Sequence, residues 1–510
     1  MHRSLSLLMA ILMFLCCVLT GCQNRPLASN QGSASSHSHT DSNDDGNCDQ
    51  CNHSVLVNFD IYVVNDLHGK FADSDNQPGV DELSTYLRGA QFSNENTILL
   101  SSGDMWQGSS ESNLTKGNIM TDWMNDMGFV AMTLGNHEFD WGEDIIRENE
   151  QIAEFPFLGI NIYNKATNER VEYCEPSVML DMNGVQIGII GAIGDCYSSI
   201  ASDWTKDIYF LVGNELTNLV EAEAKKLRDA GADFIIYSIH DGYGGTDYSD
   251  QASDGVLSGY YNSVLSDGSV DLVFEAHTHK YYIKQDKHGV YHLQGGGDNQ
   301  GITYADVDIN SVTGTASVNE AKFVGTEQYA SYSDDPIVDQ LLTKYDEQVS
   351  IGQQVLGHNS ANRSKDQIRM ICADLYYEYG MELWGDEYEI ALGGGFFSVR
   401  SPGFLQEGDV TYAQLQMLMP FDNYLVLCSI KGKDLRDKFY YSDNTNYFIS
   451  YGEYGAELKD NIDPNATYYV VVDTYTSTYG PNKLTEIERY GENIFARDLL
   501  AQYIKDGLLN

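Results

Sequence analysis

The chain has 510 residues and a formal net charge of −45, from 75 acidic and 30 basic side chains. This length allows two or three domains with ample apolar core. The acidic excess argues against binding to nucleic-acid polymers, which requires a basic surface. Nine cysteines spread over such a length indicate no dense disulfide framework.

The first 22 residues have the pattern of a secretory signal. A basic start precedes an apolar run from Leu5 to Leu19, which is short for a membrane span. The ending Leu-Thr-Gly-Cys22 resembles a bacterial lipobox, which implies that Cys22 is lipidated and becomes the mature N-terminus. The alternatives are an ordinary signal peptide and an uncleaved anchor. We expect residues 1–22 to be a lipoprotein signal peptide, with the rest anchored to the cell membrane on its extracytoplasmic face.

Residues 23–54 are rich in Ser, Asn, Asp and Gly, and this composition buries too little apolar surface to fold alone. We expect a flexible polar tether. A weak metal site and a local disulfide remain open as alternatives, because a Cys-x-x-Cys pair lies among histidines. The residues concerned are His37, His39, Cys48, Cys51 and His53. The run from Asp41 also matches the first half of an EF-hand loop, but Asn52 replaces the bidentate Glu, which disfavours tight calcium binding.

Residues 55–330 are expected to form the first domain. Five short apolar or β-branched runs in it end directly before polar side chains, as buried strands would. The side chains that follow these runs are Asp66, His68, Asp104, Asn136, His240, His277 and His279. Helical spacing between several runs, as in residues 215–230, indicates a largely parallel sheet with ligands at the carboxyl ends of its strands. Asp, Asn and His without Cys suit Zn, Mn or Fe, so the pattern predicts a two-metal site at one edge of a sheet.

Further elements are expected along the chain. Asn183-Gly184 predicts the turn of a β-hairpin, and residues 281–309 are expected to form more strands. Residues 331–354 begin with acidic residues and have apolar positions at helical spacing, which predicts a linker helix. Residues 355–510 contain no cluster of metal ligands, so this second domain is expected to bind substrate.

Five sequence elements resemble the 5′-nucleotidase family of calcineurin-like metallophosphoesterases. They are Asp-x-His-Gly at 66–69, Gly-Asp at 103–104, Gly-Asn-His-Glu-Phe-Asp at 135–140, His240, and His-x-His at 277–279. The elements occur in the family's order. The resemblance implies an α/β fold (α+β overall), with an N-terminal four-layer α/β/β/α metallophosphoesterase sandwich and a smaller C-terminal α/β nucleotide-binding domain.

The resemblance also implies roles for individual residues. The first of two divalent metal ions, Zn, Mn or similar, would be held by Asp66, His68 and His279, and the second by Asn136, His240 and His277. Asp104 would bridge the two ions. A metal-bridging hydroxide would attack phosphorus, while His137, oriented by Asp140, would stabilise the developing charge or protonate the leaving alkoxide.

The segment 408–423 resembles the C-terminal nucleoside-binding domain of the family, in which two aromatic rings sandwich the base and arginines hold the phosphate. The residues assigned to substrate in this way are Phe421, Asn423, Tyr475, Arg363 and Arg400, with Tyr479 as the alternative to Tyr475. The chain departs from the family where the glycine run 392–397 ends without an arginine, the nearest being Arg400. Gly-Pro-Asn-Lys also replaces the usual Gly-Gly-Asp after the second ring. These changes bear on which phosphate ester is preferred.

The expected function is an extracytoplasmic dinuclear-metal phosphoesterase that hydrolyses nucleoside 5′-monophosphates, with 2′,3′-cyclic nucleotides and UDP-sugars as further candidate substrates. Two alternatives remain open: a metallophosphoesterase acting on a non-nucleotide ester, and a surface lipoprotein that binds without turnover. The expected partners are a small nucleotide and the membrane, through the lipid anchor. No nucleic-acid polymer is expected to bind, and we expect a monomer or weak oligomer.

Overall fold

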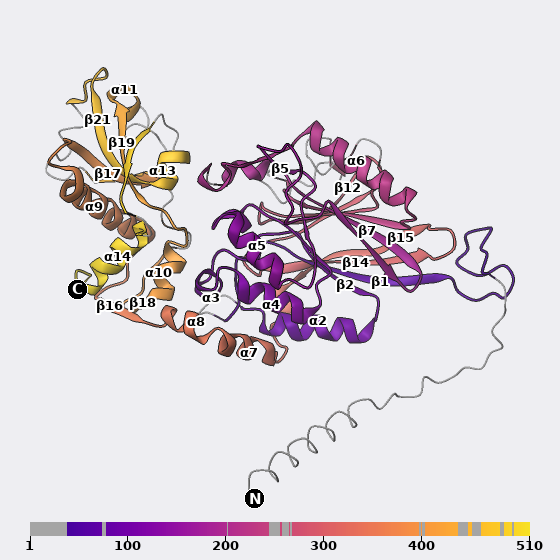
Figure 1. Ribbon diagram of the computed structural model, residues 1–510. Helices are drawn as coiled ribbons and strands as arrows, with labels where there is room; N and C mark the ends of the chain where they lie inside the picture. Colours follow the sequence, from indigo (N-terminus) through magenta and orange to yellow (C-terminus); the bar gives the residue numbers. More distant parts are fainter. Residues whose placement is uncertain are drawn as a thin grey trace, which may run out of the picture.

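The computed structural model shows a larger N-terminal part and a smaller C-terminal part, joined by helices α7 (Pro336–Lys344) and α8 (Asp346–Gly352) (Figure 1). The residues that it describes are 38–73, 78–200, 202–243, 256–257, 265, 268–396, 399, 403–436, 447–450, 461–479, 484–491 and 494–509. The predicted signal peptide with Cys22, and Arg400, lie outside the described residues. Within the described ranges, no helix combines the length and apolar character that crossing a membrane requires.

Two β-sheets form the centre of the N-terminal part. The first has the strand order β15 (Ala316–Gly325), β14 (Gly301–Asn310), β1 (Leu56–Val64), β2 (Thr97–Ser101), β3 (Ala131–Thr133) and β4 (Phe157–Leu158). The second has the order β10 (Val256–Leu257), β12 (Tyr281–Asp286), β13 (Tyr291–Gly295), β11 (Leu272–Glu275), β9 (Phe234–His240), β7 (Val185–Ile193) and β6 (Ser177–Met182). β1 to β4 are parallel, as are β7, β9, β11 and β13, so their carboxyl ends lie on one side of each sheet. A small separate sheet pairs β5 (Ile162–Asn164) with β8 (Ile208–Phe210).

Both faces of the central strands are buried, because alternate side chains along a strand point to opposite faces of the sheet. In β1, Phe59, Ile61 and Val63 lie in the apolar cluster between the two sheets. Tyr62 and Val64 belong to the cluster on the outer face. The same alternation occurs in β7. This double burial explains why the strand sequences are continuously apolar.

Helices cover the outer faces of both sheets and complete four layers (Figure 1). On the first sheet these are α2 (Asp81–Ser93), α4 (Asn118–Met127) and α5 (Glu143–Ile152), with the short α3 (Ser110–Leu114) beside them. On the second sheet it is α6 (Asn214–Asp229). The α/β/β/α sandwich is therefore confirmed. The expectation that the polar donors share one sheet edge is corrected, because the donor-bearing strands belong to two sheets whose apolar inner faces bury each other.

Several local predictions are confirmed. β6 and β7 form an antiparallel hairpin that turns at Asn183 and Gly184, with φ angles of 53° and 82°. Both residues adopt the left-handed conformation that a type I′ turn needs, and Asn-Gly favours it. α6 lies where residues 215–230 predicted a helix. The linker forms two helices instead of one, with Tyr345 between them; the first starts at Pro336 after an Asp335 cap.

The C-terminal part is built on a second core. Its five-stranded sheet has the order β20 (Tyr447–Ser450), β17 (Ile390–Phe396), β21 (Thr467–Asp473), β19 (Leu425–Lys431) and β22 (Thr485–Arg489). A separate ribbon pairs β16 (Val355–Asn359) with β18 (Gly408–Thr411). The helices are α9 (Lys365–Trp384), α10 (Tyr412–Leu418), α11 (Gly432–Leu435), α13 (Thr474–Tyr479) and α14 (Ala496–Lys505). α9, α10 and α14 share one apolar cluster with strands of both sheets.

Residues 38–54, predicted as part of the tether, fold into turns against the connection between β14 and β15. The side chain of Asn310 donates hydrogen bonds to Asp41 at 2.6 Å and to Asp44 at 2.9 Å. Thr313 donates another to Asp44 at 2.7 Å. This polar segment has little apolar surface to bury, so hydrogen bonds to the sandwich provide the contacts.

The close approach of the two sheets at Gly191 of β7 can be tested. A Cβ atom added there would lie 2.2 Å from Cβ of Leu158. We expect Gly191→Ala to lower the free energy of unfolding by about 1–3 kcal/mol through overpacking. Gly89→Ala, on an exposed position of α2 with open space around it, should raise the same quantity by about 0.5–1 kcal/mol. Urea unfolding of both variants measures the difference, and equal stabilities would contradict the predicted packing.

Candidate active site

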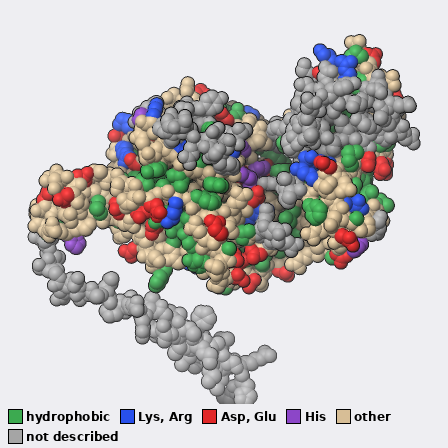
Figure 2. Space-filling model, turned by 180° about the vertical axis from the view of Figure 1, so that it is seen from behind, with side chains coloured by type: hydrophobic (Ala, Val, Ile, Leu, Met, Phe, Trp, Pro, Cys, Tyr) green, Lys and Arg blue, Asp and Glu red, His purple; other side chains and the backbone are tan. Residues whose placement is uncertain are grey.

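The seven predicted donors lie together at the carboxyl ends of strands from both sheets. The first sheet supplies Asp66, His68, Asp104 and Asn136, and the second supplies His240, His277 and His279. Asp66, Asp104 and His240 are almost completely buried, whereas the side chain of His279 is 34% exposed. Figure 2 shows histidine side chains gathered where the two parts of the molecule meet.

The donor atoms are close enough to share metal ions. Nε2 of His68 lies 2.9 Å from Nε2 of His279, and Asp66, His68 and His279 have ligand atoms within 4.8 Å of one another. Nε2 of His240 lies 3.1 Å from Asp104 and 3.2 Å from Oδ1 of Asn136. Asp66, Asp104 and His240 form a second such group. Carboxylate, amide and imidazole donors in this arrangement fit divalent cations such as Zn or Mn.

Five of the donors have backbone conformations that are unfavourable for residues other than glycine. Their φ angles are 49° at Asp66, 50° at His68, 56° at Asp104, 68° at His277 and 54° at His279. Such conformations cost about 1–3 kcal/mol each and persist where surrounding contacts impose them. Here the strand ends bind one another: the amide of Asp66 donates to Gly103, and the amide of His277 donates to the Asp66 carboxylate at 2.9 Å. The strain therefore lies where the side chains must converge.

Glu138 holds two of these loops together. Its buried carboxylate accepts hydrogen bonds from the amides of Gly135 at 2.7 Å, Asp104 at 2.9 Å and Met105 at 2.8 Å, and a longer one from Trp106. Burial raises the pKa of Glu138 to about 7, and the nearby Asp104 adds to the rise. Glu138 is thus a positioning residue: it fixes the loop after β2 relative to the loop after β3.

The histidines and carboxylates of the site hold their protons differently. Burial lowers the pKa of His240, but Asp104 and Asp66 outweigh it and raise this pKa to about 10. Burial raises the pKa of Asp104, but His240 and His137 hold it well below its usual range. Burial, together with the nearby His240, lowers the pKa of His277 to about 4. At neutral pH His277 is therefore a neutral imidazole, and His240 is paired as a cation with Asp104.

His137 lies beside the seven donors, with a ring nitrogen within 4.8 Å of ligand atoms of His68 and Asp104. Its Nδ1 lies 2.6 Å from Oδ2 of Asp140, and its backbone amide donates to Asp104 at 2.9 Å. The ring stacks on Phe421 of the C-terminal part, with centroids 5.8 Å apart and planes 27° from parallel. Asp140 thus holds Nδ1 and fixes the orientation of the ring.

A cavity of about 1110 Å³ extends from this histidine between the two parts. Asn136, His137 and His277 line it from the N-terminal part, while Phe421 and Tyr475 line it from the C-terminal part. Its basic lining residues are Lys206, Lys365 and Arg489. Asp140, Asp203 and Asp422 line the same cavity, and Asp203 pairs with both Lys206 and Arg489.

The predicted substrate residues have different placements. Phe421, Asn423 and Tyr475 line the cavity. Arg363 is absent from its lining, because the guanidinium donates to Asn359 at 2.8 Å and to the carbonyl of Leu509 at 2.8 Å. Arg363 is therefore not retained as a substrate residue, and Arg400 lies outside the described residues.

Sequence reasoning missed several residues of the site. Lys206, Lys365 and Arg489 stand in no recognisable motif, and no sequence signal singles them out. Asn65 donates to Oδ2 of Asp66 at 2.6 Å, and its position next to Asp66 could have indicated this role. Cys196 lies beside His240 and His277, but its thiol donates to the carbonyl of His240, and burial raises the pKa of the thiol well above its usual value.

Comparison with known proteins agrees with this geometry. Residues 59–281 match the calcineurin-like phosphoesterase family. Protein UshA of Yersinia enterocolitica is 27% identical over 519 residues, covering 88% of this chain and 91% of that protein. A 5′-nucleotidase of Vibrio cholerae is 31% identical over 230 residues, or 43% of this chain and 39% of that protein. The chain is thus similar to calcineurin-like phosphoesterases over residues 59–281 and to UshA and 5′-nucleotidase relatives.

The fold is shared along most of the chain. The crystal structure of a 5′-nucleotidase precursor from Thermus thermophilus superposes with a TM-score of 0.64 at 17% identity, covering 88% of this chain and 96% of that one. The family model and these relatives support a hydrolase acting on phosphate esters. Calcineurin-like phosphoesterases use divalent metal ions, and the clustered carboxylates and imidazoles are candidate ligands for them.

Glu138 provides a test of how the loops are positioned. Glu138→Gln removes the charge and reduces the capacity to accept N–H groups, so both loops should loosen. We expect metal affinity or turnover to fall by about 10–100-fold while the chain stays folded. Metal titration and the rate with an aryl phosphate measure these effects. Glu148→Gln, on the exposed side of α5, is the matched control, and a Glu138 variant that behaves like this control would contradict the assigned role.

Metal uptake by chelator-treated protein should release protons. Because the pKa of His240 is raised to about 10, the ring is protonated at pH 7 and must lose its proton to become a ligand. His277, neutral above about pH 4, contributes none. We expect at least one proton released at pH 7, from His240, and tighter binding as the pH rises toward 10. Calorimetry in buffers of different ionisation enthalpy measures this, and an enthalpy independent of buffer would contradict it.

Proposed function

We propose that the chain hydrolyses nucleoside 5′-monophosphates with the help of two divalent metal ions. One observation carries the proposal: a single cavity is lined by candidate metal ligands, Asn136 and His277, and by the aromatic side chains Phe421 and Tyr475. One nucleotide would place its phosphate near Asn136 and His277 and its base near Phe421 and Tyr475. The cavity volume, about 1110 Å³, is ample for a nucleotide.

The proposed metal ligands form two sets that share Asp104. The first set is Asp66, His68 and His279, and the second is Asn136, His240 and His277. Their chemistry fits hard or borderline cations, since the neighbouring Cys196 remains a thiol that donates to a backbone carbonyl. Bound metal ions would supply a nucleophilic hydroxide at neutral pH and neutralise the phosphate oxygens.

The chain's own residues would complete the reaction. His137 is proposed to donate a proton from Nε2 to the leaving alkoxide, or a hydrogen bond to the developing charge. Asp140 accepts at Nδ1 and so selects the tautomer with a proton on that nitrogen, stabilising the charged ring that donates from Nε2.

Substrate recognition would rest on cations and stacking. Lys365 is proposed to attract a phosphate, together with Lys206 and Arg489, which also pair with Asp203 of the cavity lining. Phe421 and Tyr475 are proposed to stack on the base, a contact worth roughly 1–3 kcal/mol per ring. Cyclic nucleotides and UDP-sugars remain candidate substrates, because stacking discriminates weakly among esters.

A second candidate is a metallophosphoesterase for a non-nucleotide ester. The placement of Arg363 favours it, because the guanidinium donates to the carbonyl oxygens of Asn359 and Leu509 and does not line the cavity where a phosphate would bind. A binding lipoprotein without turnover is disfavoured by the His137–Asp140 pair at 2.6 Å. We also propose an extracytoplasmic location with a lipid on Cys22; fatty-acid labelling that persists in Cys22→Ser would contradict this anchor.

Phosphate release from a substrate panel tests the function. The panel holds AMP, UMP, 2′,3′-cyclic AMP, a UDP-sugar and an aryl phosphate, each with chelator or with added Mn or Zn. We expect metal-dependent turnover that prefers nucleotides. Phe421→Ala should raise KM for AMP roughly 5- to 150-fold, the equivalent of one lost stacking contact, and spare the aryl ester.

Phe404→Ala, at an exposed phenylalanine of the same C-terminal part, is the matched control and should leave KM unchanged for both AMP and the aryl ester. Turnover of the aryl ester alone would favour the second candidate and discard the nucleoside pocket. No turnover with any metal would overturn the proposed reaction.

A further inference from the structure

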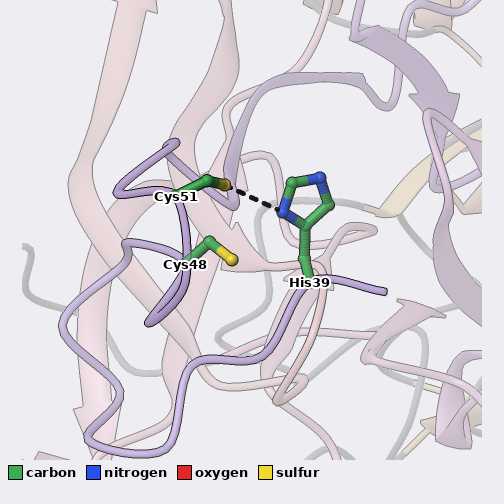
Figure 3. Close-up of side chains that lie close together, drawn as sticks. All are labelled: His39, Cys48 and Cys51. Carbon is green, nitrogen blue, oxygen red and sulfur yellow. Dashed lines mark hydrogen bonds between the residues drawn. The ribbon is translucent and has the colours of Figure 1, made fainter. Parts of the chain in front are cut away.

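The folded segment before β1 brings three soft or borderline metal ligands together. Figure 3 shows His39, Cys48 and Cys51 pointing toward one another. Sγ of Cys51 lies 3.6 Å from Nδ1 of His39, and the ligand atoms of all three residues lie within 4.8 Å of one another. Both cysteines are thiols outside any disulfide; Cys48 is buried and Cys51 is exposed. The cluster therefore has a fixed interior side and an open side through which an ion can enter.

Backbone hydrogen bonds build this cluster. The amide of Asn52 donates to the carbonyl of Cys48 at 2.7 Å, which closes the Cys-x-x-Cys turn, and Asn52 adopts φ 55° there. The amide of Asp49 donates to Thr40 at 2.7 Å, which places His39 beside the turn. Gly46 (φ 79°) is also required, since a Cβ atom on it would lie 2.7 Å from Leu56. The side chains thus converge because the main chain brings them together.

The segment occupies a definite place on the sandwich. Asp41 and Asp44, before the cysteine turn, accept hydrogen bonds from Asn310 and Thr313. After the turn, the carbonyl of Val55 accepts one from the amide of Ser311. Figure 1 shows the segment at the end of the sandwich away from the C-terminal part. The cluster is therefore separate from the cavity of the candidate active site, whose lining contains none of these residues.

The donor set selects a particular class of ion. Thiolates with imidazole favour Zn²⁺ over Ca²⁺, Mg²⁺ or Mn²⁺. With Zn–S near 2.3 Å and Zn–N near 2.0 Å in a tetrahedral site, adjacent S and N ligands lie about 3.5 Å apart. The observed 3.6 Å between Sγ of Cys51 and Nδ1 of His39 is close to this separation. The remaining contacts, within 4.8 Å, need only small side-chain rotations.

We propose that His39, Cys48 and Cys51 bind one Zn²⁺ ion that fastens the segment 38–54 to the sandwich. The fourth position is taken by His53 or water. The ring of His53 lies 6.1 Å from that of His39, within reach of the same ion after a small movement. Acidic side chains at Asp45 and Asp49 add negative charge that favours a cation, while their oxygens accept hydrogen bonds within the loop. The ion is structural: it stabilises the chain where it enters the catalytic body.

Zinc content of the purified chain tests the proposal. After exposure to zinc and removal of loosely bound metal, the wild type should retain about one more zinc ion per chain than the Cys48→Ser/Cys51→Ser variant. Chelator-treated protein loaded with Co²⁺ should show thiolate-to-cobalt charge-transfer absorption that the double variant lacks. Cys196 is present in both proteins, so its contribution cancels in the difference spectrum. Amide exchange of residues 38–54 should slow on zinc addition in the wild type and not in the double variant.

Ser42→Ala, in the same loop but outside the cluster, is the matched control and should keep the ion. Turnover of an aryl phosphate should be equal in all three proteins, which separates this site from the proposed active site. Equal zinc content and no difference spectrum between wild type and double variant would overturn the proposal. A Cys48–Cys51 disulfide that, once reduced, still takes up no zinc would overturn it as well.

Discussion

The carboxylate of Glu138 holds the loops after β2 and β3 in one arrangement, and the candidate active site depends on it. Asp66 plays the corresponding part between the sheets, because its carboxylate accepts the amide of His277. Burying such charges costs several kcal/mol each unless hydrogen bonds or cations compensate. Backbone amides supply one share of that compensation, and a bound cation would supply another. The contacts that fix the loops therefore also favour metal binding.

The proposed phosphate binding has to be compatible with an acidic surface. Figure 2 shows acidic side chains scattered over both parts of the molecule. The cavity is lined by both signs of charge: Lys206, Lys365 and Arg489 from the two parts, with Asp203 paired to two of them. Bound metal ions would add positive charge at the same place. Local potential, and not net charge, would govern the approach of an anionic substrate.

The position of Phe421 depends on an ion pair across the two parts. Its neighbour Asp422 lies 2.9 Å from Lys116 of the N-terminal part and 2.7 Å from Arg497 of the C-terminal part. Burial raises the pKa of Asp422, but these two cations outweigh it and hold the pKa below its usual value. A charged Asp422 therefore links the parts and keeps the ring against His137. Substrate contacts and the junction between the parts are thus coupled.

What the sequence alone determined is local. The ends of buried strands can be located from composition and periodicity, so the seven donors and the Asn183-Gly184 hairpin were predicted by residue number. The role of His137 was predicted only by the family resemblance. Only the tertiary structure decided that these strands lie in two sheets, that Arg363 binds protein carbonyls, and that Lys206, Lys365 and Arg489 share a cavity. It also decided between a loose tether and a folded loop at His39 and Cys51. These outcomes depend on contacts between segments far apart in the chain, which no local pattern encodes.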